Sequence, residues 1–248
     1  CKICDNSYEQ ISKKHIVISL FKFNLHCMRD YIVVGAGPGG CSCARSLLEH
    51  GYIVLLVEQT DGSNNELSAA NAPTESFTST DNFECIIGSG RGGGTNHHGL
   101  QYVDHQFVKD TIPGKEGCHT TANNHIRPSS VTGKSLSNKL SEIFPDIVSN
   151  KVYSRNLQTR FTSFEILSNI DKDFELIYKK VDKLVMVNDS ATGVLCTDGV
   201  TLDCSKGVIL AGGAIHTPLI LQRTGYGPRD VLTTAGIEVK EEMPAGTT

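Results

Sequence analysis

Three glycines that follow a short apolar run constrain the fold of this chain more than any other feature of its sequence. The run Tyr31–Val34 is typical of a buried parallel strand. Gly35, Gly37 and Gly40 come directly after it at G-x-G-x-x-G spacing, and apolar residues then recur at helical spacing over 41–50. In such a unit the first glycine permits a tight turn, the second lets a pyrophosphate approach the backbone, and the third lets helix and strand pack closely. The segment therefore predicts a strand, a phosphate-binding turn and a helix.

The acidic residue Glu58 completes this unit. It ends a second apolar run, Ile53–Val57, about 20 residues after the first glycine, where dinucleotide-binding folds place the acidic ribose ligand. Its carboxylate can accept hydrogen bonds from both ribose hydroxyls, and its charge disfavours a 2′-phosphate. The phosphates would meet the free N–H groups at the helix N-terminus, beside Pro38 and Gly39. The pattern predicts dinucleotide binding; the alternative is a nucleotide-binding fold that has lost its ligand.

Two further glycine-rich segments follow along the chain. Residues 88–99 contain six glycines and are typical of a loop whose backbone packs against something flat or anionic. Residues 207–218 predict a buried strand, a glycine turn and the start of a helix. That helix is expected over 219–224 and ends at Gly225, before the sequence Tyr-Gly-Pro.

Together these segments resemble the glucose–methanol–choline (GMC) family of FAD-dependent oxidoreductases. The first is similar to the family's FAD fingerprint, and Gly92–Thr95 is similar to its flavin-facing loop. Residues 213–228, which begin Gly-Ala-Ile-His-Thr-Pro, are similar to its second signature, with Thr224 and Tyr226 as departures. The resemblance implies an α/β fold: a Rossmann-like, FAD-binding parallel sheet with helices and a small β-meander.

The resemblance also implies a domain organisation. Residues 28–248 would form the FAD-binding domain, with a polar, loop-rich insertion over 104–171, and residues 1–27 would be an extension, possibly disordered. The parts of the domain that carry the likeness are 28–60, 85–103 and 172–248. Residues 61–84 are rich in polar residues and are expected to be a linker.

Specific residues are implied at the cofactor. In the family a Val backbone pairs with the adenine, and Val181 is at the matching position. A branch of the family attaches the flavin covalently to a His that corresponds to His97, so FAD is held either with one covalent link or without any. The residues expected to contact FAD are Gly35, Gly37, Pro38, Gly39, Gly40, Glu58, Gly93, Gly94, Thr95, Asn96, His97, His98, Val181, Ala211 and Gly212. No catalytic or metal-binding residue is assigned.

The family's catalytic His acts as a general base while hydride passes to flavin N5, and it lies well beyond the second signature. This sequence stops at Thr248, soon after that signature, and no His within it is at the corresponding place. His216 lies at a variable position of the signature and is interpreted as structural. We therefore expect the catalytic part to be absent, the substrate domain to be missing or rudimentary, and this chain alone to be inactive.

Three functions stay open. The first is a GMC-type oxidoreductase, present as a truncated or short form, that acts on the CH–OH group of a small-molecule alcohol. The second is a non-catalytic or degenerate flavin-binding fragment. The third is a member similar to the hydroxynitrile lyases of the family, which share the FAD domain.

Composition excludes other classes. A net charge of −4 argues against a nucleic-acid partner, and no run approaches the roughly 18 apolar residues of a membrane-spanning helix. The apolar run over 16–21 is interrupted by Lys22 and does not make a convincing signal peptide. Nine cysteines at irregular spacing are a poor disulfide framework and favour a reducing, intracellular compartment, although the sequence does not define the localisation.

Overall fold

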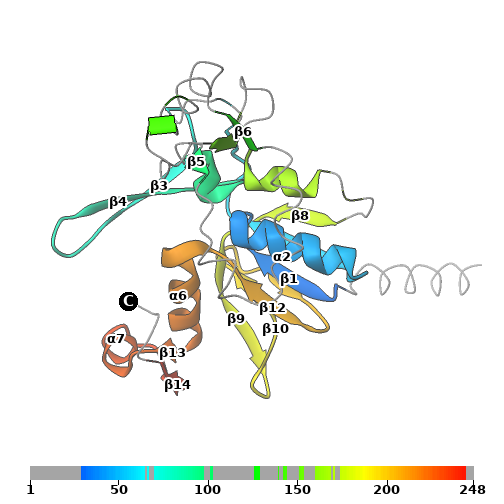
Figure 1. Ribbon diagram of the computed structural model, residues 1–248. Helices are drawn as coiled ribbons and strands as arrows, with labels where there is room; N and C mark the ends of the chain where they lie inside the picture. The colour runs from blue at the N-terminus through cyan, green and yellow to red at the C-terminus, as the bar shows by residue number, and fades with distance from the viewer. Residues whose placement is uncertain are drawn as a thin grey trace, which may run out of the picture.

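The centre of the fold is a four-stranded parallel sheet (Figure 1). The computed structural model describes residues 29–64, 66, 70–97, 101–102, 126–128, 139, 142–143, 151–153, 160–168, 170 and 174–243. The sheet strands are, in spatial order, β12 (Gly207–Leu210), β1 (Tyr31–Val34), β2 (Val54–Glu58) and β8 (Glu175–Tyr178). Val33 lies in register with Ile209 on one side and Leu56 on the other. This parallel sheet confirms the predicted α/β, Rossmann-like fold.

Helix α2 (Pro38–Glu49) covers one face of the sheet, together with the short helix η2 (Ser163–Leu167). The helix begins three residues earlier than its apolar spacing indicated, because Pro38 fits the first helical position, where an N–H would have no partner. Gly51, with φ of +86°, follows its end. The buried residues of this layer are Val33, Ala36, Cys41, Ala44, Leu48, Val54, Leu56 and Leu167.

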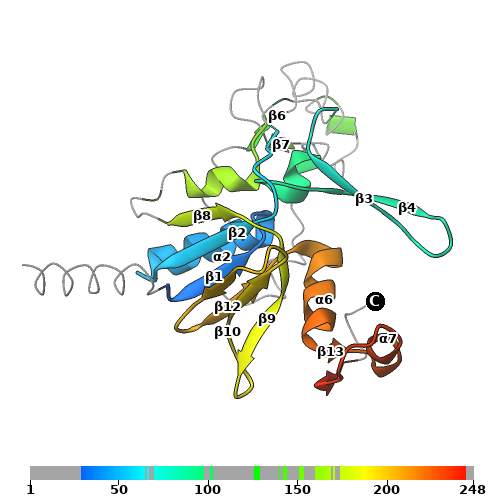
Figure 2. The ribbon, with the colours of Figure 1, turned by 180° about the vertical axis from the view of Figure 1, so that it is seen from behind.

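A β-meander and helix α6 (Gly213–Thr224) cover the opposite face (Figure 2). The meander strands are β9 (Val181–Val187), β10 (Ser190–Cys196) and β11 (Thr201–Asp203), paired antiparallel. The buried residues of this layer are Ile32, Val34, Leu55, Val57, Val181, Val194, Cys196, Leu202 and Ile220. Alternate residues of each central strand thus face opposite layers, which gives three layers with the sheet in the middle.

A β-hairpin, β3 (Thr74–Thr78) and β4 (Glu84–Gly88), projects away from the sheet (Figure 1). It lies largely within the stretch 61–84 that was expected to be a linker, so that expectation was wrong. Threonine, serine and glutamate dominate β3, and its only large apolar residue is Phe77, which hides the two-residue periodicity of a strand.

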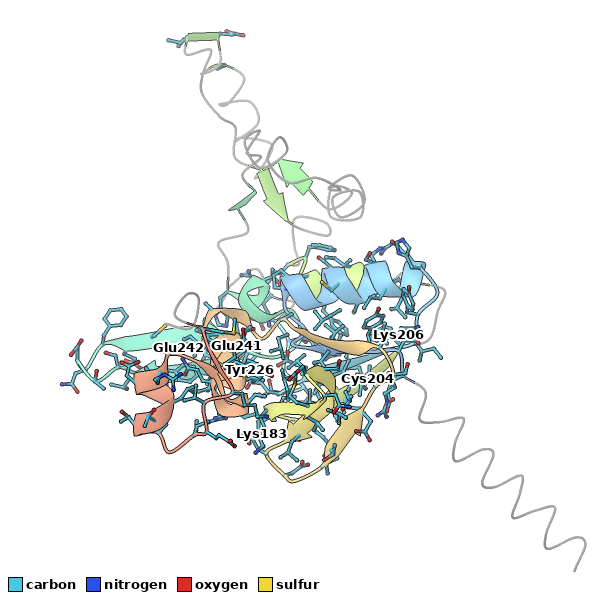
Figure 3. The ribbon with its side chains drawn as sticks, turned by 90° about the horizontal axis from the view of Figure 1, so that it is seen from below. Lys183, Cys204, Lys206, Tyr226, Glu241 and Glu242 are labelled. Atoms are coloured by element: carbon cyan, nitrogen blue, oxygen red, sulfur yellow. The ribbon has the colours of Figure 1, made fainter. Side chains whose placement is uncertain are left out.

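Smaller elements complete the described part of the chain. They are η1 (Gly93–Asn96), β5 (Gln101–Tyr102), β6 (Ile126–Pro128), β7 (Lys151–Tyr153), β13 (Tyr226–Gly227), α7 (Arg229–Thr234) and β14 (Glu241–Glu242). Figure 3 shows Tyr226, Glu241 and Glu242 together at the β13–β14 pair, and Cys204 and Lys206 just before β12, at the amino ends of the parallel strands. None of the helices in the described ranges has both the length and the apolar character needed to cross a membrane. Residues 1–27 lie outside the described residues.

Candidate functional site

A cavity of about 730 Å³ lies at the carboxyl ends of the four parallel strands. The residues that directly follow β1, β2, β8 and β12 all line it, namely Gly35, Gln59, Lys179 and Ala211. Open parallel sheets bind their ligands at this edge, in the crevice outside the strand ends. The position of the cavity is therefore set by the topology of the sheet.

The turn between β1 and α2 forms one wall of the cavity. Gly35 has a φ of +100°, and a Cβ there would overlap the carbonyl oxygen of Ala211. A Cβ on Gly40 would in turn overlap the carbonyl oxygen of Gly35. At both positions neighbouring backbone excludes any side chain, so the protein's own packing requires glycine.

Gly37 differs from both. Its backbone is extended, with φ of −80° and ψ of −171°, which any residue adopts. A Cβ there would meet only the Cα of Gly93, at 3.9 Å, and the residue lines the cavity. The protein's own packing therefore tolerates a side chain at Gly37, and that side chain would occupy the cavity. A glycine at this place leaves room for a ligand against bare backbone, as a pyrophosphate requires.

Glu58 is 6% exposed and lies between two backbone donors. Its Oε2 accepts a hydrogen bond from the Ala36 N–H at 2.8 Å, and its Oε1 accepts one from the Gln59 N–H at 2.8 Å. A carboxylate offers about four acceptor positions, so each oxygen keeps one for a hydroxyl group. Because Glu58 also lines the cavity, its carboxylate can meet a ribose there while it holds the glycine turn.

The loop around η1 faces this turn, but its polar side chains point into the protein. Asn96 is fully buried, and its amide group donates to the carbonyls of Ser89 and Arg91 and accepts from the Asn64 N–H. Thr95 Oγ1 donates to the Gly92 carbonyl at 2.6 Å. These bonds fix the shape of the loop and leave its glycine backbone to line the cavity.

His97 also belongs to the inner side of this loop. Its Nε2 donates to the carbonyl oxygen of Pro73, at 2.7 Å, because a carbonyl can only accept. A Cβ on Gly88 would meet the His97 ring at 2.7 Å, so imidazole and backbone are tightly packed. His97 does not line the cavity, and His98 lies outside the described residues.

Residues at the end of the predicted insertion form hydrogen bonds that support the loop around η1. Arg160 is 2% exposed, and its guanidinium donates to the carbonyls of Glu66 and Thr95. The Ser163 N–H donates to Thr95 Oγ1 at 2.9 Å, and the Ser163 hydroxyl donates to the Gly92 carbonyl. Sequence reasoning missed this support, because an arginine in a polar stretch gives no sign that it is buried.

The structure brings most of the predicted cofactor residues together in one cavity. Those that line it are Gly35, Gly37, Pro38, Gly39, Glu58, Gly93, Gly94, Val181, Ala211 and Gly212. Gly40, Thr95, Asn96 and His97 lie behind the cavity wall and shape the two loops. Among the described residues, no group of three or more His, Cys, Asp or Glu side chains could hold a metal ion.

Several polar residues that line the cavity were not predicted. Gln59, Lys179 and Lys180 follow the carboxyl ends of β2 and β8, a position that could have indicated them. His216, interpreted as structural from the sequence, lies in α6 and lines the cavity as well.

The pKa shift at Cys41 is explained by packing. Burial raises the pKa of the Cys41 thiol to about 12, and its Sγ–H donates to the Ala36 carbonyl at 3.2 Å. This cysteine is therefore a neutral, packed side chain under the glycine turn.

Comparison with known proteins identifies one matching family and several related proteins. A family described as an NAD(P)-binding Rossmann-like domain matches residues 33–63. The chain is 25% identical to (R)-mandelonitrile lyase 1 of Prunus serotina, over 87% of this chain and 46% of the lyase. It is 27% identical to sinalpyl alcohol oxidase Nec3 of Nesocodon mauritianus, over 87% of this chain and 48% of the oxidase. A shorter match, 49% identical over 43 residues, or 17% of this chain and 8% of the relative, is to a putative GMC-type oxidoreductase of Acanthamoeba polyphaga mimivirus.

A solved structure shares the fold. The crystal structure of pyridoxine 4-oxidase from Mesorbium loti superposes with a TM-score of 0.65 and 17% identity, over 87% of this chain and 55% of the oxidase chain. The chain spans about half the length of the curated relatives that it matches over most of its own length.

Proposed function

Because the chain belongs to the glucose–methanol–choline family of flavoprotein oxidoreductases, we propose that its cavity binds FAD and that it serves the oxidation of a CH–OH group. The name of the alcohol oxidase among its relatives supports an alcohol substrate. FAD, when bound, supplies an acceptor for the hydride that leaves the alcohol carbon.

The observation that carries the FAD proposal is Gly37. Nothing in the protein's own packing requires glycine there, yet a side chain would fill the cavity beside the N-terminus of α2. That helix end offers backbone N–H groups and a positive dipole to a pyrophosphate. Glu58 would accept the ribose hydroxyls, and Val181, 7% exposed at the start of β9, would lie at the adenine.

Equilibrium titration of the purified chain with FAD, NAD⁺ and NADP⁺ tests this proposal. We expect FAD to bind at one site per chain, with the absorption bands of a bound flavin. NADP⁺ should bind worst, because its 2′-phosphate would meet the charge of Glu58. Tighter binding of NAD⁺ than of FAD would contradict the flavin assignment.

A further inference from the structure

Glu75, on strand β3 of the hairpin, bonds to three side chains at once. Its Oε2 accepts hydrogen bonds from His216 Nε2 at 2.7 Å and from Gln59 Nε2 at 2.8 Å. Its Oε1 accepts one from Lys180 Nζ at 2.9 Å. The Glu75 side chain is 25% exposed, so these bonds are partly shielded from water.

The three donors come from three separate elements, and all of them line the cavity. Gln59 follows Glu58 at the end of β2, and Lys180 precedes Val181 at the start of β9. His216 lies in the first part of α6, where its Cβ would be 3.0 Å from a Cβ on Gly212. The Glu75 carboxylate therefore links three side chains that line the cavity. Two of them are next in sequence to Glu58 and Val181, which line the cavity as well.

Two further observations support a fixed arrangement. The ring of Phe77, two residues along β3, contacts the His216 ring edge-on at 5.6 Å between centroids. Partial burial raises the pKa of Glu75, but the hydrogen bonds from Lys180, Gln59 and His216, with the charge of His216, outweigh it and lower the pKa to about 2. The carboxylate thus stays charged wherever the protein works near neutral pH.

We propose that Glu75 is a positioning residue that orients Gln59, Lys180 and His216 to recognise the adenosine diphosphate part of the cofactor. Long side chains such as Lys and Gln lose rotamer freedom when they bind a ligand, and a side chain that is already held loses less. The Lys180 ammonium has three donors and needs only one for Glu75. Glu75 does not itself line the cavity, so it acts through its three partners.

The inference rests on the proposed function, and ADP is the probe that separates the two. We would measure ADP binding to the full chain by calorimetry for the wild type, Glu75→Gln and Glu84→Gln. Glutamine keeps the shape of Glu75 but removes the charge and turns an NH₂ group toward the donors. Glu84 lies in the same hairpin, is exposed and is far along β4 from the cavity residues Ile87 and Gly88, so it is a matched control.

We expect Glu75→Gln to weaken ADP binding about tenfold, which equals about 1.4 kcal/mol, and Glu84→Gln to leave it within twofold. FAD binding should weaken by the same factor as ADP binding. A purely structural role would instead lower the melting temperature and leave the ADP affinity unchanged, and that result would overturn the inference.

If Glu75→Gln does not give the circular dichroism spectrum of the wild type, His216→Phe removes the Nε2 donor from α6 and keeps an aromatic ring beside Phe77. ADP affinity equal to that of the wild type in this variant would also overturn the inference. Failure of the wild-type chain to bind either ADP or FAD would instead overturn the proposed function itself.

Discussion

Gly35, Gly37 and Gly40 belong to one spacing motif but differ in what their surroundings require. Gly35 and Gly40 are required by contacts within the protein, since a Cβ at either would overlap backbone. Gly37 has space on the protein side, and its backbone conformation suits any residue. At the scale of single residues, the motif therefore contains two glycines that packing requires and one that it does not require, and this third glycine is the one we propose for the pyrophosphate.

Gly37→Val places a side chain in the proposed pyrophosphate site. The chain should keep its circular dichroism spectrum and lose FAD binding, because the new side chain fills the space beside the helix N-terminus. Gly207→Val is the matched control: a Cβ there would meet only Tyr31 Cε1 at 4.0 Å, in an edge strand that favours Val. Full flavin stoichiometry in Gly37→Val would contradict the assignment of the pyrophosphate site.

Residues of the site were predictable where the signal is local in the sequence. The glycines and Glu58 follow strands at fixed spacing, so the pattern alone indicated them. Other residues contact partners that are far away in the sequence, and a local spacing pattern cannot indicate such contacts. They are Glu75, Arg160 and His216. Asn96 was predicted near the flavin, but only the fold places its amide inside the loop.

The elements around the cavity differ in the kind of interaction that fixes their position. Helix α2 packs on the sheet through buried apolar residues, whereas η1 is held by polar bonds from Asn96, Arg160 and Ser163. The central strands β1 and β2 were predictable because their apolar runs are buried on both faces. The hairpin β3–β4 was not, because its sequence is mostly polar.

Asn96→Ala tests the polar support of η1. The substitution leaves the carbonyls of Ser89 and Arg91 and the Asn64 N–H without this partner in a buried place. Each such loss costs about 1–3 kcal/mol, so chemical denaturation should show a fall of at least that size in the unfolding free energy. A change below about 0.5 kcal/mol would show that the loop does not depend on this amide.

The charge of Glu75 should make the hairpin's contribution to stability depend on pH. Its pKa is lowered from 4.5 to about 2 in the folded chain, so the unfolded chain binds the proton more readily between these values. The stabilisation is complete above pH 4.5 and is lost as the pH falls toward 2.

Unfolding of the wild type and of Glu75→Gln across this range measures the effect. We expect the difference in unfolding free energy between them to be constant above pH 4.5 and to shrink as the pH falls to 2. A difference that does not change with pH would mean that the carboxylate is not stabilised in its charged form.

On the scale of the whole molecule, two apolar layers on opposite faces of one sheet leave a cavity at its carboxyl edge. Among the described residues that line this cavity, His216 is the one imidazole, and its Nε2 is bonded to Glu75. A positioned general base typically contributes about 10²–10⁴-fold to a rate. We interpret the bond to Glu75 as the role of His216, and not proton transfer from a substrate.

We therefore expect the 248-residue chain, loaded with FAD, to give no turnover with primary or secondary alcohols and an artificial electron acceptor. Free FAD in the same buffer is the control for background reduction. Turnover on the order of 1–10³ per second would show that a base lies within these residues.

We propose that the adenosine diphosphate part of FAD binds at the carboxyl edge of this sheet. A crystal structure of the chain grown with FAD would locate the bound cofactor. We predict the pyrophosphate beside Gly37 and the N-terminus of α2, with the ribose hydroxyls at the Glu58 carboxylate. FAD bound elsewhere on the chain, or a cavity that stays empty at saturating FAD, would contradict the claim.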